Sequence, residues 1–342
     1  MVIAAEQERL LICSPNWVGD AIMSMPALQA FRRAAPGAEI TMLTKPALAP
    51  LWQMHGAIDR VEVFEESPAG TFRAGALLRA IGYRRAFLFS NSFRSALIPY
   101  LGRVPERIGA AGHWRRAMLT GLVHYHLSSL RRHQTFEYFD ILGLETAGFD
   151  APRLSLPVEA VSGAAEKVGT APARRVGVLP GAARGPSKRW PVEYFAAVAQ
   201  RLAREQSAHV VVFGSGAEND TCRAVAGWAG DHAINLAGRT TLPEWAAALK
   251  LCDLVICNDS GGMHLAAAVG TPVLAVYGLT DPARTGPLGT RRRIIQDSMV
   301  RSRDIARRSD AAQKCLAAIE PNRVYEAALE CLDVFRRNSS AA

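Results

Sequence analysis

The chain has 342 residues, a length that predicts about two domains. Its 49% hydrophobic and 21% charged residues are typical of a folded globular protein and exclude a fibrous or disordered chain. The formal net charge of +9 predicts an anionic partner, which nucleic acid, an anionic membrane surface or a phosphorylated substrate would each satisfy. There is no signal-peptide pattern and no apolar run of the roughly 18 residues that a membrane span needs, so we expect a cytoplasmic protein.

The first half of the chain alternates short apolar strands with helices. A helix is predicted from about Asp20 to Ala34, ended by Pro36 and Gly37. Strands are predicted at residues 10–13, 39–43, 61–64 and 86–90. This alternation predicts a parallel sheet covered by helices.

The stretch from Val158 to Arg175 turns to Ala, Gly, Pro and Val with little periodicity, which predicts an interdomain linker. A second alternating series follows, with strands at residues 176–179, 209–213, 254–257 and 273–277 and helices at 192–205, 218–229, 242–251, 262–269 and 321–336. We therefore expect an α/β fold of two Rossmann-like, doubly wound domains facing a central cleft, where ligands bind at the carboxyl ends of the strands.

The expected domain bounds follow from this series. Residues 1–165 form an N-terminal Rossmann-like domain, and residues 175–320 form a C-terminal one. Residues 321–342 form a final helix and tail, which we expect to pack back toward the N-terminal domain.

The loop from Ser14 to Asp20 joins the first strand to its helix. Gly19 permits a tight turn, and Asp20 stands at the carboxyl end of the strand. Asp20 could cap the helix by accepting main-chain N–H bonds. Alternatively, it could direct its carboxylate into the cleft as a general base.

Two glycine-containing loops follow strands in the second half. The segment from Gly181 to Lys188 can bring main-chain N–H groups and an ammonium group against phosphate, although it lacks the Walker A pattern and could be a solvated basic turn. Gly214-Ser-Gly216 is too incomplete for a dinucleotide fingerprint. Glu218 behind it could bind a ribose or simply favour the helix N-terminus.

The segment from Asn258 to His264 is the most informative. A buried strand ends at Asn258-Asp259, and Ser260, Gly261 and Gly262 then open a helix with unhindered N–H groups. Such a helix start is an anion site suited to a diphosphate. His264 on the first turn is either a packed histidine or part of that site.

Three motifs in this order, SPNWVGDAIMSMPAL, PGAARGPSKRWPVEYF and NDSGGMHLAAAVGTPVLAVYG, resemble the lipopolysaccharide heptosyltransferases of glycosyltransferase family 9. The resemblance runs from about residue 10 to residue 293. It implies a GT-B fold and an inverting transfer from an ADP-heptose donor, with no metal and no cofactor besides the nucleotide sugar.

The resemblance also assigns residues. It places the catalytic aspartate at Asp20, the diphosphate-binding lysine at Lys188, and a nucleotide-contacting acid at Glu218. The donor loop falls on Asp259, Ser260, Gly261 and His264. Lys188 and the helix amides would stabilise the leaving ADP, whereas Asp259 would orient donor hydroxyls or the loop.

Between Thr71 and Thr135 the chain has eleven arginines and one acid, Glu106. These arginines are either a solvated surface or an acceptor-binding side, because guanidinium groups match phosphate and carboxylate. Few aromatic residues interleave them, which argues against nucleic acid. The candidates on this acceptor side are Arg84, Arg85, Arg94, Arg115, Arg116, Arg131 and Arg132.

The sequence therefore predicts a glycosyltransferase that moves heptose to an anionic, lipid-linked inner-core saccharide, with possible peripheral contact at the inner membrane. A GT-B enzyme with another nucleotide sugar or acceptor, a nucleotide-sugar epimerase or dehydrogenase, and a non-catalytic anion-binding protein are the alternatives.

Overall fold

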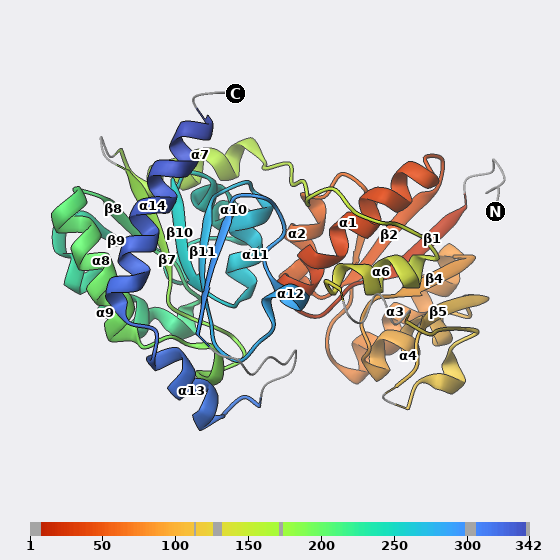
Figure 1. Cartoon of the computed structure of the whole chain (residues 1–342). Coiled ribbons are helices and arrows are strands. Elements are labelled where there is room, and N and C mark those ends of the chain that lie inside the picture. Colours follow the sequence, from red (N-terminus) through yellow and green to blue (C-terminus); the bar gives the residue numbers. More distant parts are fainter. Residues whose placement is uncertain (1–7, 113, 126–131, 171–173, 298–305, 340–342) are drawn as a thin grey trace. The chain divides into compact units, whose positions relative to one another are not determined.

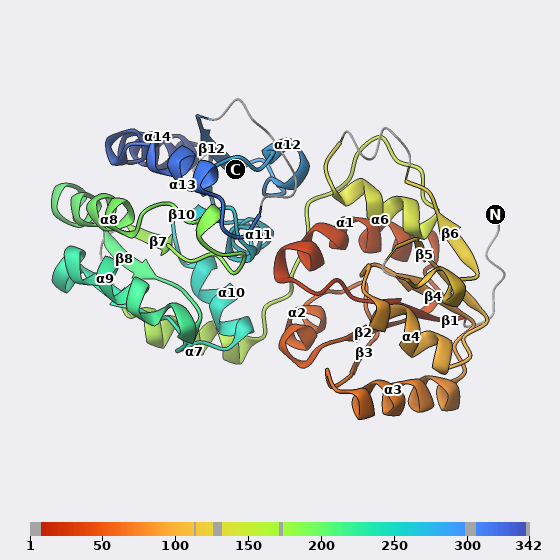
Figure 2. The same ribbon diagram turned by 90° about the horizontal axis from the view of Figure 1, so that it is seen from below.

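The computed structural model describes residues 8–112, 114–125, 132–170, 174–297 and 306–339. The chain divides into two compact units, Met1–Ser155 and Leu156–Ala342. Each unit is a six-stranded parallel sheet with helices packed on it, as Figures 1 and 2 show. The α/β, doubly wound architecture predicted from the sequence is confirmed.

The first sheet has the strand order β3-β2-β1-β4-β5-β6. Its strands are β1 (Arg9–Cys13), β2 (Glu39–Thr44), β3 (Arg60–Val63), β4 (Arg85–Leu88), β5 (Glu106–Ala110) and β6 (Gly121–Val123). Cys13 pairs with Leu43 on one side and with Leu88 on the other, so these strands end level with one another. The loops that follow them therefore gather at one edge of the sheet.

The second sheet has the order β12-β11-β10-β7-β8-β9. Its strands are β7 (Arg175–Leu179), β8 (His209–Val212), β9 (Ala233–Asn235), β10 (Leu254–Asn258), β11 (Val273–Tyr277) and β12 (Arg292–Gln296). Cys257 pairs with Leu179 and Asn258 with Val276, again with the strand ends level.

Helices connect the strands, as parallel pairing requires. In the first unit they are α1 (Val18–Ala34), α2 (Ala49–Gln53), α3 (Pro68–Ile81), α4 (Phe93–Leu101) and α6 (Thr135–Leu142), with short 3₁₀ turns η1 (Pro46–Leu48) and η2 (Arg116–Met118). In the second they are α7 (Val158–Val168), α8 (Val192–Gln206), α9 (Asn219–Ala229), α10 (Leu242–Lys250), α11 (Gly261–Ala268), α12 (Pro282–Thr285), α13 (Asp310–Ala317) and α14 (Pro321–Ser339), with η3 (Pro186–Lys188), η4 (Gly216–Glu218) and η5 (Gly230–His232).

Both sheets have a point where the strand order reverses. In the first sheet it lies between β1 and β4, and in the second between β7 and β10. At such a point the connections leave toward opposite faces of the sheet, and the loops leave a crevice at the carboxyl edge. All the sequence motifs singled out above directly follow one of these four strands or, for Glu218, the neighbouring β8.

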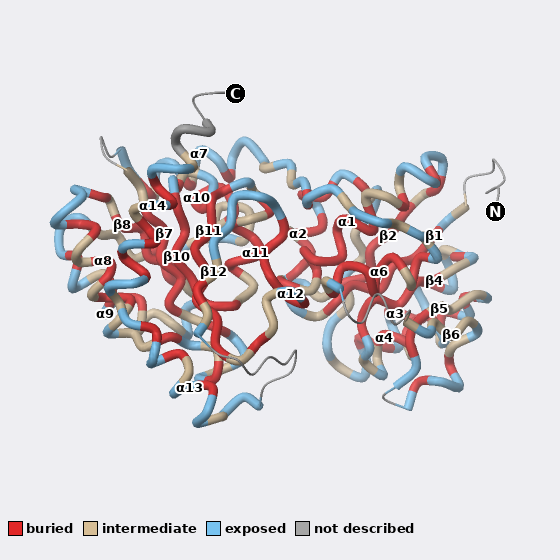
Figure 3. Tube along the Cα trace, viewed as in Figure 1, coloured by how far each residue is buried: buried red, intermediate tan, exposed pale blue. Residues whose placement is uncertain are grey.

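The central strands are buried along their length because helices cover both faces of each sheet (Figure 3). Val178, Ile256 and Leu274 lie in the core of the second unit, and Leu11, Leu43 and Leu88 in one core of the first. The six cysteines are free, and all but Cys315 are buried.

The linker expected between Val158 and Arg175 is instead largely the helix α7. Its buried residues Ala160, Ala164 and Val168 recur every four positions and form a narrow stripe, and the helix packs on α10. Because two of these three side chains are alanines, the stripe gives only a weak hydrophobic periodicity in the sequence, and the sequence of this segment therefore indicates a linker. The unit boundary accordingly falls at Ser155, before the helix.

The final helix α14 packs on α8, β10 and β11 within the second unit. Its expected packing toward the N-terminal domain stays a prediction. Val324, Ala328 and Cys331 on its apolar face belong to the core of that unit.

Candidate active site

Asp20 lies in the first turn of α1, directly after the loop that follows β1. The residue in the capping position is Trp17, whose side chain makes no capping hydrogen bond. Gln134 Nε2 donates to Asp20 Oδ1 at 2.9 Å, and the Asp20 side chain is partly exposed. Gln134 thus orients a carboxylate that solvent or a substrate can still reach.

Gln134 and Tyr138 flank the inner side of Asp20. Gln134 is buried at the start of α6 and its Nε2 lies 3.3 Å from the Tyr138 hydroxyl. Burial, and secondarily the negative charge of Asp20, raises the pKa of Tyr138 well above its ordinary value. The two side chains therefore stay uncharged and neither competes with Asp20 for a proton.

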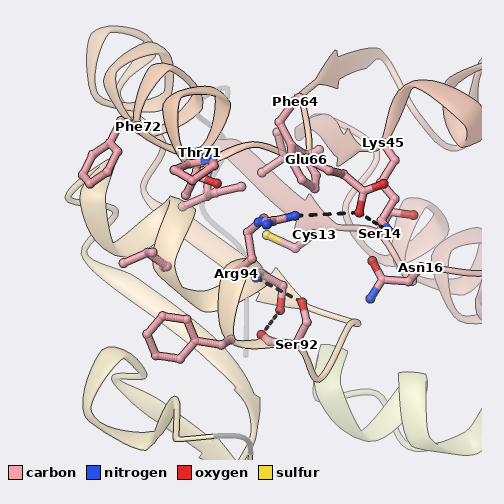
Figure 4. Close-up of a pocket in the computed structure, with 16 residues that line it drawn as sticks. Cys13, Ser14, Asn16, Lys45, Phe64, Glu66, Thr71, Phe72, Ser92 and Arg94 are labelled. Carbon is pink, nitrogen blue, oxygen red and sulfur yellow. Dashed lines mark hydrogen bonds and ion pairs between the residues drawn. The ribbon is translucent and has the colours of Figure 1, made fainter.

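The loops after β1 and β4 meet at the carboxyl edge of the first sheet. Asn16 Nδ2 donates to Ser90 Oγ at 2.7 Å, and Trp52 Nε1 donates to Ser14 Oγ at 2.8 Å. Ser92 caps α4 by accepting from Ser95 N at 3.2 Å. These bonds fix the walls of a pocket of about 510 Å³ (Figure 4).

This pocket has a polar and an apolar part. Lys45, Glu66 and Arg94 supply its charges, with Lys45 Nζ 2.6 Å from Glu66 Oε1. Further lining residues are Ser14, Asn16, Phe64, Thr71, Phe72, Ser92 and Phe93. Of the arginines expected on the acceptor side, Arg94 is the one that lines this pocket.

Arg84 and Arg85 lie at the other edge of the first sheet. Arg85 is the first residue of β4 and pairs in register with Leu10, near the amino end of β1. Its Nε donates to Glu106 at 2.6 Å, while Arg84 is exposed and lies 4.0 Å from the same acid. The structure therefore does not bring these two arginines together with Asp20 or Arg94.

Arg115 was expected to contact the acceptor, but its side chain is fully buried. Its guanidinium donates to the carbonyls of Ala110 and Ser90 and to Asn91 Oδ1 at 2.9 Å. Burial lowers its pKa. Arg115 is thus a structural cation that holds the β4–α4 loop, which forms one wall of the pocket.

The other arginines of this segment have separate places. Arg116 is exposed in η2, and Arg132 Nη2 donates to the carbonyl of Ala147 at 2.6 Å. Arg131 lies outside the described residues.

In the second unit, Lys188 and Asp259 meet at the carboxyl edge. Lys188 Nζ lies 2.5 Å from Asp259 Oδ2, and only 11% and 7% of the two side chains are exposed. Asn258, fully buried, accepts from Trp190 N at 2.9 Å and donates to the carbonyl of Pro180 at 2.8 Å. The loop after β7 is thereby tied to the end of β10, which brings two sequence motifs into one site.

The helix α11 begins at this site. Ser260 is its capping residue, and Gly261 and Gly262 form its first two positions. A Cβ on Gly262 would lie 2.8 Å from Trp245 Cζ2 and 3.0 Å from Leu179 Cδ1, so close packing demands a glycine there. His264 is buried, in the first turn of the same helix.

Glu218 lies beside Gly181. Its Oε2 accepts from Ser215 N at 2.9 Å, which is one half of a capping box with Ser215, and also from Ser215 Oγ at 2.8 Å. A Cβ on Gly181 would stand only 2.0 Å from Glu218 Oε1. The missing side chain of Gly181 thus makes room for this carboxylate next to the phosphate-loop candidate.

Within the described ranges, no three His, Cys, Asp or Glu side chains gather as a metal site. A search of the same residues found no helix long and apolar enough to cross a membrane. Metal independence stays a prediction from the resemblance.

Comparison with known proteins gives concordant matches. Lipopolysaccharide heptosyltransferase 2 of Salmonella typhimurium is 31% identical over 346 residues, which cover 93% of this chain and 97% of the relative. Lipooligosaccharide heptosyltransferase 2 of Haemophilus influenzae is 32% identical over 309 residues, covering 84% and 88%.

Solved structures agree. Escherichia coli ADP-heptose lipopolysaccharide heptosyltransferase II superimposes with a TM-score of 0.83 at 26% identity, covering 95% of this chain and 98% of that one. A family 9 glycosyltransferase from Veillonella parvula, at 23% identity, shares the fold with a TM-score of 0.84, covering 97% and 99%. The predicted GT-B fold is thereby confirmed.

The family model for glycosyltransferase family 9 (heptosyltransferase) matches residues 71–314. Together with the extended identity to the Salmonella relative, this match establishes that the chain is a glycosyltransferase and belongs to glycosyltransferase family 9.

Proposed function

We propose that this protein transfers a heptose from ADP-heptose to an anionic inner-core acceptor of lipopolysaccharide, as the heptosyltransferase 2 relatives do by name. The observation that carries the proposal is the site at the switch point of the second sheet. There the Lys188 ammonium lies beside the first turn of α11, and both suit a diphosphate.

The second unit, residues 156–342, is proposed as the donor side. The N–H groups at Gly261 and Gly262 and the Lys188 ammonium would bind the two phosphates and stabilise the charge that develops as ADP leaves. Glu218, beside Gly181, would accept from the ribose hydroxyls. Asp259 holds Lys188 in place and thus acts on the phosphates through that lysine.

Asp20 in the first unit is proposed as the base. The acceptor hydroxyl oxygen attacks the anomeric carbon of the heptose while its proton passes to the Asp20 carboxylate. The bond from the anomeric carbon to the phosphate oxygen breaks, and ADP leaves with that electron pair. Gln134 keeps Asp20 oriented throughout, and attack from the face opposite ADP inverts the anomeric configuration.

A direct test measures ADP release from ADP-heptose with an inner-core acceptor. Asp20→Asn keeps the shape of the side chain but cannot take a proton, so kcat should fall by about 100- to 10,000-fold. Asp150→Asn is the matched control, because Asp150 is an exposed carboxylate of the same unit that pairs with Arg33. A wild-type kcat in Asp20→Asn would remove Asp20 from catalysis.

Nucleotide choice is tested by thermal stabilisation with ADP, UDP and GDP, since a ligand that binds the folded state raises its melting temperature. ADP should stabilise most, and Lys188→Met should lose most of that shift relative to its own ligand-free value. Lys250→Met, at the exposed end of α10, should retain it. Equal stabilisation by all three nucleotides would contradict an ADP-sugar donor, and loss of activity in EDTA would contradict metal-independent transfer.

Peripheral contact with the cytoplasmic face of the inner membrane is proposed for the first unit. The exposed arginines of residues 71–135, among them Arg79, Arg103 and Arg116, support it, because each basic group near an anionic lipid surface contributes about 1 kcal/mol. Trp114, 96% exposed beside Arg116, is suited to the interface region. Flotation with anionic vesicles at low salt should recover the protein, and its absence from the vesicle fraction would count against membrane contact.

A further inference from the structure

The pocket at the carboxyl edge of the first sheet contains a carboxylate between two cations. Glu66 Oε1 lies 2.6 Å from Lys45 Nζ and 3.7 Å from Arg94 Nη1. Figure 4 shows both cations directed at Glu66 from different sides. Lys45 follows β2, Glu66 follows β3 and Arg94 lies in the first turn of α4, so three separate parts of the chain converge on this point.

The acid is the most accessible member of the three. Half of the Glu66 side chain is exposed, against 25% of Lys45 and 37% of Arg94. Ion pairs with this access to water contribute about 0–1 kcal/mol, so little free energy opposes the departure of Glu66. Glu66 also lies between β3 and α3, outside any helix or strand.

The rest of the lining is suited to a saccharide. Apolar walls with a few oriented polar groups are typical of small-ligand sites. Phe72 and Phe93 are exposed large apolar side chains at this pocket, and Phe64 lies near the charges. The partly exposed Asn16 and Ser92 supply an amide and a hydroxyl group that can pair with sugar hydroxyls.

We propose that Glu66 occupies the place of the substrate's own anionic group. A carboxylate or phosphate on the acceptor saccharide displaces Glu66 and pairs with Lys45 and Arg94 in its stead. The inference rests on the proposed function in taking a saccharide as the acceptor, and it goes further by naming the residues that select its charge.

This exchange makes Glu66 a determinant of specificity. A neutral saccharide cannot replace the ion pairs that Glu66 makes, so it gains nothing from the two cations. An anionic saccharide replaces them with its own charge-assisted hydrogen bonds. Removing the carboxylate should therefore strengthen the binding of anionic sugars and leave neutral ones unaffected.

The test is calorimetric titration of the full chain, without donor, with three matched sugars: glucuronate, glucose 6-phosphate and glucose. Glu66→Gln keeps the size of the side chain and should bind the anionic sugars about 3- to 10-fold more tightly than wild type. Lys45→Met and Arg94→Met should each weaken that binding by a similar factor. Glucose binding should not change in any variant. The relative gain for glucuronate and glucose 6-phosphate tells whether a carboxylate or a phosphate fits better.

Glu65→Gln is the matched control for the acid. Glu65 is the neighbouring residue, pairs with exposed Arg73 and does not line the pocket. Glu65→Gln and Glu66→Gln each remove one negative charge, so they change the net charge of the protein equally. Arg84→Met is the matched control for the Lys45 and Arg94 variants, because Arg84 lies at the opposite edge of the sheet. Equal tightening by Glu65→Gln and Glu66→Gln would show a bulk charge effect and overturn the proposal. So would an absence of anionic-sugar binding in Glu66→Gln at the highest soluble sugar concentration.

Measurements of enzymatic turnover distinguish a failure of this inference from a failure of the proposed function. With acceptor and ADP-heptose, Glu66→Gln should lower the KM for the acceptor and leave kcat unchanged, since the reacting atoms are not touched. A chain that binds anionic sugars as described but releases no ADP from ADP-heptose would contradict the donor assignment alone. A chain that is active, with the same acceptor KM in wild type and Glu66→Gln, would contradict the exchange alone.

Discussion

Each sheet of this protein carries a lysine–carboxylate pair at its carboxyl edge, and the two pairs differ in their access to water. Lys188 and Asp259 are 2.5 Å apart, with 11% and 7% of their side chains exposed. Lys45 and Glu66 are 2.6 Å apart, with 25% and 50% exposed. The distances are nearly equal, so burial is what distinguishes the pairs.

Burial changes what such a pair can do. In a poorly solvated site, separating the charges leaves each without compensation, so the pair behaves as one fixed part of the site. Near the surface, water and salt replace either partner at small cost. The buried pair of the second unit is thus rigid, as the proposed diphosphate site requires, whereas the exposed pair of the first unit suits the exchange proposed for Glu66.

The largest expected effect comes from removing the acid of the buried pair. Asp259→Asn leaves the Lys188 ammonium buried without its counter-ion and should lower the free energy of unfolding by about 3 kcal/mol. Glu66→Gln should change it by at most about 1 kcal/mol. Urea titration followed by circular dichroism measures both, and equal losses would show that burial does not separate the pairs.

Arg115 and Arg84 extend the comparison to single cations of the first unit. Arg115→Met should lower the free energy of unfolding by about 2 kcal/mol, since the carbonyls of Ser90 and Ala110 lose their donors inside the protein. Arg84→Met, with ion pairs of 3.7 and 4.0 Å at the surface, should stay within about 0.5 kcal/mol. A stable Arg115→Met variant would mean that the β4–α4 loop does not depend on this guanidinium.

Substitutions of two glycines test the rigidity of the carboxyl edge of the second sheet. Gly262→Ala forces a methyl group against Trp245 and Leu179 and should lower stability by about 1–2 kcal/mol. Gly181→Ala meets the end of the Glu218 side chain, which can swing away, so stability should change by less than about 1 kcal/mol. ADP affinity, measured by calorimetry, should nevertheless fall in Gly181→Ala. Unchanged affinity there would argue that Glu218 does not contact the nucleotide.

A separate expected effect is a pH dependence of stability in the first unit. His55 is buried, its ring nitrogens have no hydrogen-bond partner among the described residues, and burial lowers its pKa from 6.5 to about 4. Because the folded state resists protonation, stability from this group is complete above about pH 6.5 and is lost as the pH falls toward 4. By pH 5 the loss should be about 1–2 kcal/mol.

His55→Asn isolates that contribution, because asparagine is polar but does not titrate. The variant's own stability at pH 7 is irrelevant to the test; what is compared is the change in unfolding free energy between pH 7 and pH 5. The change should be smaller in the variant than in the wild type. Parallel pH profiles would exclude His55 as the cause of acid sensitivity.

The sequence predicted those parts of the site that are local in the chain. Asp259, Ser260 and Gly261 follow a buried strand and open a helix, so strand, turn and helix periodicity sufficed to place them. The contact between Gln134 and Asp20 joins residues 114 positions apart, and no local pattern signals it. The Lys45–Glu66 pair likewise depends on the order in which strands assemble.

The number of arginines in a segment predicts the position of a binding site less well than the local motifs do. A count of arginines does not separate the fully buried Arg115 from the exposed Arg116. Arg84 and Arg85 did carry a usable signal, since they precede the apolar strand residues and so stand at its amino end. The direction of the strand is by itself enough to exclude these two arginines from the carboxyl edge, where ligands bind.

The helix α7 bears on how the two units can be separated for study. Lys167 Nζ on α7 lies 2.7 Å from Glu244 on α10, and this bond lowers the pKa of Glu244. A C-terminal fragment cut at residue 175 would lack α7 and so remove the helix that packs on α10. A fragment cut at Leu156 keeps that helix. Its autonomous folding and its response to nucleotide could then be studied without the first unit.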